Sequence, residues 1–241
     1  PRHRARRGRT GRTLAGMDVH PYAGNKWGGK YLRAPDIFFT ILEKARGKLV
    51  RLGDIAEVRR GFTTGANEFF YLEPVGRTVK EVAELRERDP MAPVRVRNGA
   101  GWEGEIEAAW LRPVIKSPRE IRTLRVRLED LRYLVFMPPE DVREAIDQGQ
   151  NPTLSRYPRA AAYIRWGETQ GYHQRPTCAS RRWWWDVEQV QAPILWWKSI
   201  GERYGCLLND ARAVSDQRSY SVLINPGIDP ISFAAVCNTS L

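Results

Sequence analysis

The sequence predicts an α+β fold with mixed, mostly antiparallel strands and several short helices. Segments with strand and with helix periodicity both occur, and they do not alternate in the regular order of a parallel α/β sheet. The chain is also long enough to bury a substantial core, because 42% of its 241 residues are hydrophobic. Its apolar runs are all shorter than the roughly 20 residues that span a bilayer, so we expect no membrane partner.

The charge of the chain points to a polyanionic partner. The net charge is +11, which favours nucleic acid. A large share of it lies in residues 1–30, where six arginines precede the first acidic residue, Asp18. This stretch has no apolar periodicity, so we predict a flexible Arg/Gly-rich arm and linker there. Residues 31–241 are predicted to form one domain.

The first predicted element of that domain is a helix that starts at Pro35 and Asp36. Its apolar residues fall on one face, and Gly47 is placed to end it. Alternating residues around 56–59 then predict a strand. Residues 61–68 are rich in Gly, Thr and Asn, and they predict a polar loop after this strand.

The next segments are predicted from shorter patterns. The aromatic run 69–72 predicts a strand, and the charged residues 73–108 predict an insertion with weak structure. A short strand is predicted over 111–115. Residues 117–120 have the composition of a capping box with proline at the first helical position, so we expect a brief helix after Ser117.

The rest of the chain is predicted to hold helices and strands in irregular order. The pattern predicts helices over 140–148 and 158–168, and strands over 133–137, 194–197, 206–208 and 220–224. A last helix is predicted with Asp229 as its cap and Pro230 at its first position. No glycine closes it, so we expect the domain to be truncated within this helix.

The sequence shows no signature of a common reaction. Three widely spaced cysteines and three histidines predict neither a disulfide framework nor a zinc site, and they fit a reducing cytoplasm. The loop after Arg60 lacks the Lys-Ser/Thr ending of a phosphate-binding loop, and no nucleophile elbow occurs. Glu103 and Glu105 can in principle bind a metal ion, but a solvated strand face is the favoured interpretation.

A resemblance to a known family is carried by residues 48–72, which read KLVRLGDIAEVRRGFTTGANEFFYL. This stretch resembles the start of the target recognition domain of adenine-specific DNA methyltransferases. Their restriction fusions and, more distantly, the specificity subunits of type I restriction systems share the pattern. Similar pieces follow in the family's order at residues 111–117, 175–176, 182–184 and 235–241.

The resemblance implies a target-recognition-domain-like module that reads double-stranded DNA from loops on a rigid α+β scaffold. It also implies that catalysis belongs to a methyltransferase domain or subunit outside this chain. That catalytic part would bind S-adenosylmethionine and carry an Asn-Pro-Pro-aromatic stretch. In this chain we expect no cofactor, no metal and no catalytic residue.

The residues themselves suggest where DNA would be contacted. The hydroxyls and amide of the 61–68 loop can bond base edges or phosphate oxygens, and flanking arginines add charge. A helix N-terminus near Lys116 can hold a phosphate. The predicted DNA contacts are Arg59, Arg60, Thr63, Thr64, Asn67, Lys116, Arg119, Arg181, Arg182, Lys198, Arg203 and Arg218.

Several alternatives stay open at this point. Gly61 and Gly65 can simply make a turn that Asn67 caps, and the tryptophans at 183–185 and 196–197 fit the core better than base stacking. A nuclease or other nucleic-acid enzyme with an unrecognised carboxylate site is a second function. A non-specific RNA-binding protein is a third, supported only by the arginine-rich arm.

Overall fold

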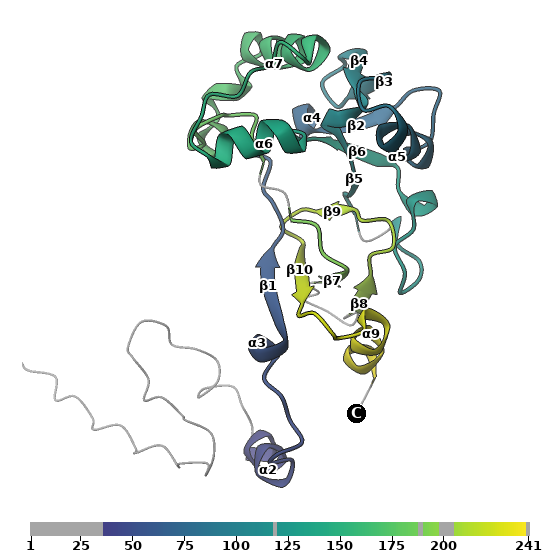
Figure 1. The fold of residues 1–241 in the computed structure, drawn as a ribbon, viewed down its shortest axis with the longest axis vertical. Helices are drawn as coiled ribbons and strands as arrows, with labels where there is room; N and C mark the ends of the chain where they lie inside the picture. The colour runs from purple at the N-terminus through teal and green to yellow at the C-terminus, as the bar shows by residue number, and fades with distance from the viewer. Residues whose placement is uncertain (1–35, 118–119, 188–189, 198–204, 240–241) are drawn as a thin grey trace, which may run out of the picture. The chain divides into compact units, whose positions relative to one another are not determined.

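The computed structural model describes residues 36–117, 120–187, 190–197 and 205–239 (Figure 1). The chain divides into two units, one up to residue 54 and one from residue 55 onward. In the first unit, α2 (Asp36–Lys44) is followed by a turn at Gly47, whose φ is +76°. This confirms the predicted helix and its glycine stop. The short helix α3 (Leu52–Ile55) lies at the unit boundary. The predicted boundary near residue 30 lies outside the described residues.

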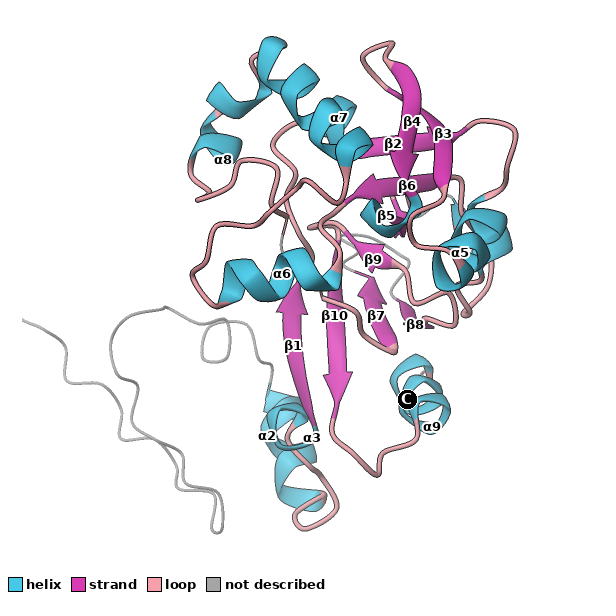
Figure 2. Ribbon diagram, turned by 45° about the horizontal axis from the view of Figure 1, so that its top comes forward, coloured by secondary structure: helices cyan, strands magenta, loops and turns pink. Residues whose placement is uncertain are grey.

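Two sheets form the framework of the second unit (Figure 2). The smaller sheet has the order β1-β10-β7-β8, with all neighbours antiparallel, and consists of β1 (Ala56–Arg60), β7 (Ile194–Trp197), β8 (Gly205–Leu208) and β10 (Ser219–Ile224). The larger sheet has the order β4-β3-β2-β6-β5-β9, and its one parallel pair is β5 with β9. Its strands are β2 (Tyr71–Pro74), β3 (Pro93–Asn98), β4 (Glu103–Glu107), β5 (Leu111–Ile115), β6 (Tyr133–Phe136) and β9 (Val214–Ser215).

Short helices connect and cover these strands. They are α4 (Asn67–Phe70), α5 (Val79–Arg88), α6 (Glu140–Asp147), α7 (Pro158–Thr169), α8 (Pro176–Ala179), α9 (Pro230–Asn238) and the 3₁₀ turns Ala108–Trp110, Leu128–Asp130 and Tyr172–Gln174. The start of α7 is held by a fully buried carboxylate, because Glu107 accepts the N–H groups of Arg159 and Ala160 at 2.8 Å each. None of the helices in the described part of the chain could cross a membrane. The α+β prediction is confirmed.

Aromatic side chains fill the core between the larger sheet and α7. The ring of Phe69 stacks on Tyr163 with centroids 4.5 Å apart, and the ring of Trp110 stacks on Phe136 at 4.8 Å. Trp184 and Trp185 join this cluster and are almost wholly buried. These two tryptophans are therefore core residues, the favoured interpretation of the sequence. Stacked and edge-on aromatic pairs of this kind add about 1 kcal/mol each to simple burial.

Two of the predicted segments are wrong. Phe69 and Phe70 belong to α4, and the strand begins only at Tyr71. Both phenylalanines are fully buried, which one helical turn allows but a strand between a core and solvent does not. Residues 73–108 are regular structure, because Thr78 and Glu81 form a capping box at the start of α5 and buried valines alternate with exposed arginines along β3.

The other predicted elements are confirmed with small shifts of their ends, and Asp229 caps α9 by accepting the N–H of Ser232 at 2.7 Å. The brief helix expected after Ser117 falls on residues 118–119, which lie outside the described residues. Strand β9 was not predicted, since two residues are too few to show a period.

Candidate functional site

Two segments that cross between the sheets lie side by side. Residues 61–66 run from β1 toward α4 and β2, and the turn 216–218 joins β9 to β10. The N–H of Phe62 donates to the carbonyl of Ser215 at 3.2 Å, and the N–H of Gln217 donates to the carbonyl of Phe62 at 2.9 Å. We call these two segments the double crossing.

Two glycines make the double crossing possible. A Cβ atom on Gly61 would lie 2.0 Å from the carbonyl oxygen of Asp216, so no other residue fits there without a backbone shift. Gly65 has φ +76°, and a Cβ on it would lie 2.6 Å from the Cβ of Thr177. The backbone geometry of the double crossing therefore requires glycine at both positions.

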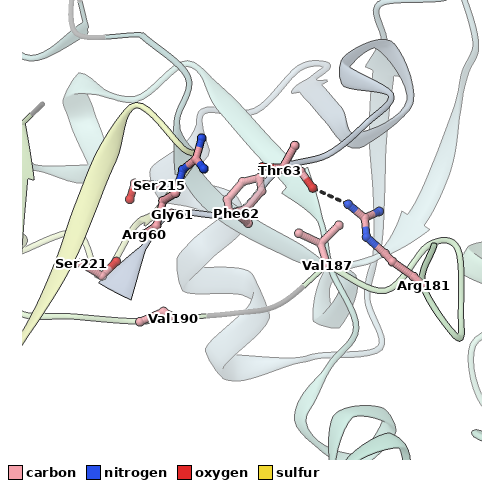
Figure 3. Close-up of a pocket in the computed structure, with 9 residues that line it drawn as sticks. All are labelled: Arg60, Gly61, Phe62, Thr63, Arg181, Val187, Val190, Ser215 and Ser221. Atoms are coloured by element: carbon pink, nitrogen blue, oxygen red, sulfur yellow. Dashed lines mark hydrogen bonds between the residues drawn. The ribbon is translucent and has the colours of Figure 1, made fainter. Parts of the chain in front are cut away.

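Three adjoining hollows surround the double crossing. The first, of about 330 Å³, is lined by Arg60, Gly61, Phe62, Thr63, Arg181, Val187, Val190, Ser215 and Ser221 (Figure 3). The second, also about 330 Å³, shares Phe62 and Thr63 with the first and adds the turn 216–218 and Arg175. The third, of about 510 Å³, shares Asn67, Glu68 and Tyr71 with the second. Each hollow therefore adjoins the next through shared lining residues, and together we call them the chain of three hollows.

Positive charge dominates the lining of these hollows. Seven basic residues line them, Arg60, Arg97, Lys116, Arg132, Arg175, Arg181 and Arg218, against three acidic ones, Glu68, Glu73 and Asp216. Each acidic residue already forms a salt bridge: Glu68 with Arg175 at 2.5 Å, Glu73 with Arg97 at 2.7 Å, and Asp216 with Arg218 at 3.6 Å. The surplus charge is positive, which suits a ligand with phosphate groups.

The polar loop residues differ in exposure. Thr64 is only 4% exposed, and its hydroxyl donates a hydrogen bond to Oδ1 of Asn67, so this threonine stabilises the loop from within. Thr63 and Asn67 are exposed. In the described part of the chain the Asn67 amide nitrogen has no hydrogen-bond partner, so it can donate to a ligand. We therefore keep Thr63 and Asn67, and leave out Thr64, in the contact surface proposed below.

Arg181 is an internal support of the double crossing. Its guanidinium donates to the main-chain oxygen of Thr63 (Figure 3). It also donates to the main-chain oxygens of Thr64 and Trp184, at 3.1 Å each. Burial lowers the pKa of this guanidinium. Arg182, by contrast, is exposed and donates to the carbonyl of Gly149 at 3.0 Å. Arg181 therefore holds the loop, and Arg182 lies on the surface outside the three hollows.

The other predicted basic contacts differ in where they lie relative to the hollows. Arg60 is exposed at the rim of the first hollow and donates to Gln217 at 2.8 Å. Arg59 forms a salt bridge with Glu57 at 2.7 Å along the same strand. Arg218 donates to the carbonyl of Lys116 at 2.6 Å and so connects the turn 216–218 to the third hollow. The predicted contacts Arg119, Lys198 and Arg203 lie outside the described residues.

Lys116 is held between two tyrosine rings at the third hollow. Its Nζ lies 3.9 Å from the ring centroid of Tyr133 and 5.3 Å from that of Tyr71. Burial lowers the pKa of this ammonium. The hydroxyl of Tyr71 donates to Asp216 at 3.2 Å, and the hydroxyl of Tyr133 bonds Glu73; burial and these carboxylates raise the pKa of both phenols.

Among the basic and tyrosine residues that line the hollows, five were not predicted as contacts: Arg97, Arg132, Arg175, Tyr71 and Tyr133. Arg97 lay in the segment predicted to have weak structure, and Arg132, Tyr71 and Tyr133 had no local signal. The alternation of valine and arginine along residues 93–97 was the signal that would have placed Arg97 on an exposed strand face.

No metal site is visible in the described residues. They contain no group of three or more His, Cys, Asp or Glu side chains placed to hold an ion. Glu103 pairs with Arg95 at 2.7 Å and Glu105 with Arg159 at 3.4 Å, which is the solvated strand face favoured from the sequence. The thiol of Cys178 is buried and donates to the carbonyl of Thr64 at 3.6 Å.

Comparison with known proteins gives one result. Residues 135–241 match the family described as Type II methyltransferase M.Eco57I, C-terminal domain. The match extends from β6 through α9, so this part of the chain is similar to a methyltransferase-associated domain. It includes Arg175, Arg181 and Arg218 but begins after residues 48–72 and 111–117. A search of curated protein sequences finds no match.

Proposed function

We propose that this chain is the sequence-specific double-stranded DNA recognition module of an adenine-specific DNA methyltransferase or restriction-modification enzyme. The observation that carries the proposal is the chain of three hollows with seven basic lining residues around the double crossing. Basic side chains neutralise phosphates, and loop amides and hydroxyls discriminate bases. The similarity of residues 135–241 to a methyltransferase C-terminal domain supports the same assignment.

The roles divide between affinity and selectivity. Arg60, Arg175 and Arg218 would contact phosphates, because charge at a surface groove acts on any DNA sequence. Thr63 and Asn67 would contact base edges from the loop. The catalytic step and S-adenosylmethionine belong to a methyltransferase domain or subunit that acts in the cytoplasm together with this module.

A selection experiment tests the proposal. The purified chain is incubated with a duplex library that has a random core, at about 150 mM salt, and the bound DNA is amplified and sequenced over several rounds. We expect one short motif to be enriched. Equal retention of all sequences, or tighter binding of single-stranded RNA, would contradict the proposal and favour the non-specific RNA-binding alternative.

Two activity assays test the remaining alternatives. Added magnesium with a labelled duplex would reveal cleavage if an unrecognised carboxylate site made the chain a nuclease. Tritiated S-adenosylmethionine would reveal methyl transfer to DNA. We expect neither product from this chain, and either one would show that it carries its own catalytic centre.

A further inference from the structure

The third hollow contains one cation that differs from the others in how firmly it is placed. Lys116 directly follows the last residue of β5, and its Nζ lies over the face of Tyr133, 3.9 Å from the ring centroid. No salt bridge among the described residues involves it, whereas Arg97 and Arg132 in the same hollow both pair with Glu73. The carboxylates of Glu73 and Glu120 act electrostatically on this ammonium, but neither forms a salt bridge with it, so it can still donate to a ligand while its position is restrained.

Both rings that restrain Lys116 are themselves fixed by their hydroxyl groups. Tyr71 donates to Asp216 at 3.2 Å, and Tyr133 bonds Glu73, which is also bound by the guanidinium of Arg97. The main chain of Lys116 is fixed as well, since its carbonyl accepts a 2.6 Å hydrogen bond from Arg218. The ammonium therefore occupies a small volume even without a ligand.

We propose that Lys116, positioned by the rings of Tyr133 and Tyr71, determines sequence specificity by donating to the O6 and N7 acceptors of a guanine. This rests on the proposed function, and it names the base that the third hollow would recognise. In the major groove guanine presents two neighbouring acceptors, whereas cytosine presents an amino donor and adenine presents one acceptor beside an amino donor. A fixed ammonium attracts the two acceptors of guanine and is repelled by the amino groups of cytosine and adenine.

The restraint on Lys116 decides between a base contact and a phosphate contact. An exposed cation at the rim of a hollow, such as Arg60, can contact a phosphate of any DNA sequence and contributes charge without selectivity. A cation that is held in place and partly desolvated in a hollow contributes binding energy only when an acceptor atom of the ligand lies at the right position. Because the position of this ammonium is restrained by the ring of Tyr133 and by the hydrogen bond to its own carbonyl, it discriminates between ligand atoms at different positions, which is what reading one base pattern requires and what a backbone contact does not need.

The experiment compares variants by the same random-core selection. Lys116→Met keeps the length of the side chain and removes its charge, and we expect it to lose the preference for guanine at one position of the motif by about 5- to 150-fold. Affinity for random duplex should fall far less than this preference, because the six other basic residues of the hollows keep their charge. Lys80→Met is the matched control, because Lys80 is an exposed lysine on α5 outside the hollows, paired with Glu129.

The positioning role is tested at Tyr133. Tyr133→Leu removes the ring face and should weaken the same guanine preference, whereas Tyr133→Phe keeps the ring and should retain most of it. A merely structural role would move the melting temperature of both variants and leave the base preference alone. If Lys116→Met does not fold, Lys116→Arg and Tyr133→Leu are compared instead. We expect Lys116→Arg to retain the preference for guanine and Tyr133→Leu to lose it.

Two results would overturn the inference. The first is that Lys116→Met weakens binding to all sequences alike and makes the salt slope shallower by about one unit, as a phosphate contact would. The second is that its motif equals that of the parent. Both require a parent that selects a motif, so they are distinct from failure of the proposed function, in which the parent selects none.

Discussion

The Cα of Gly61 faces the main-chain carbonyl of Asp216 so closely that a Cβ would lie 2.0 Å from its oxygen. This approach brings the end of β1 against the turn between β9 and β10, and so joins the smaller sheet to the larger one. The N–H of Gly61 adds a 3.1 Å hydrogen bond to the carbonyl of Ser219. The three hollows depend on this contact, because residues of both segments line them.

The first prediction follows from this contact. Gly61→Ala should lower the free energy of unfolding by roughly 2 to 4 kcal/mol, because the new methyl group meets main-chain atoms that cannot rotate away. Gly205→Ala is the matched control: of the residues that the structure describes, a Cβ there meets Leu207 at 3.7 Å, an ordinary contact. Chemical denaturation of both variants measures the difference. Equal stability would show that the double crossing relaxes easily.

The sequence predicted elements whose signals are local. The helix over 158–169 and the cap at Asp229 follow from spacing, proline and an acidic cap residue, which act within one or two turns. Phe69 and Phe70 were misassigned because an aromatic run is compatible with a strand or a buried helical turn. Their burial against Tyr163 and Trp184 is a long-range contact, and local patterns do not contain it.

The candidate site was predictable to a similar extent. The loop of residues 61–68 was identified from its composition, and Arg60 and Asn67 lie where that interpretation put them, exposed at the hollows. The internal bonds of Thr64 and Arg181 could not be read from sequence, because they join residues more than a hundred positions apart or depend on a particular turn. The tyrosine pair around Lys116 combines three separate strand ends and was invisible for the same reason.

The second prediction concerns Arg60 as a phosphate contact. Arg60→Ala should weaken selected and random duplex by similar factors and make the salt slope shallower by about one unit. Arg88→Ala serves as control, because Arg88 is exposed in the last turn of α5 and lines none of the three hollows. Binding measured at several salt concentrations decides the matter. A loss confined to the selected sequence would instead make Arg60 a base contact.

The third prediction concerns the arginine-rich arm. Deleting residues 1–13 removes six arginines, which should flatten the salt dependence of binding by at most about five units without changing the selected motif. Arginines on such an arm neutralise phosphates whatever the DNA sequence is. The selection experiment on the shortened chain checks this. A changed motif would mean that the arm contacts bases.

The fourth prediction is a pH dependence of stability. The hydrogen bond from Arg175 holds the pKa of the Glu68 carboxyl below its ordinary value of 4.5. A carboxyl whose folded pKa is lowered adds stability above its unfolded pKa, and that stability is lost as pH falls from about 4.5 through the folded value. Glu68→Gln should therefore reduce the loss of stability as the pH falls below about 4.5. An unchanged acid profile would mean that the pair is fully screened by solvent.

The fifth prediction separates the two roles of Asn67. Its Oδ1 accepts the hydroxyl of buried Thr64, while the residue itself is exposed and lines the second and third hollows. Asn67→Ala should cost about 1 to 2 kcal/mol of stability, because the Thr64 hydroxyl loses its acceptor. It should also cost about 1 to 3 kcal/mol of binding to the selected duplex and little on random DNA.

A double variant removes the stability effect so that the binding effect can be read alone. Thr64→Val replaces the hydroxyl by a methyl group of similar size, so the orphaned donor disappears and Asn67→Ala in that background should melt close to Thr64→Val by itself. The selectivity for the chosen motif should still fall, since the amide that contacts the base is absent in the double variant as well. If the double variant keeps full selectivity, the amide serves the loop alone, and base reading must come from Thr63 at the double crossing or from Lys116 at the third hollow.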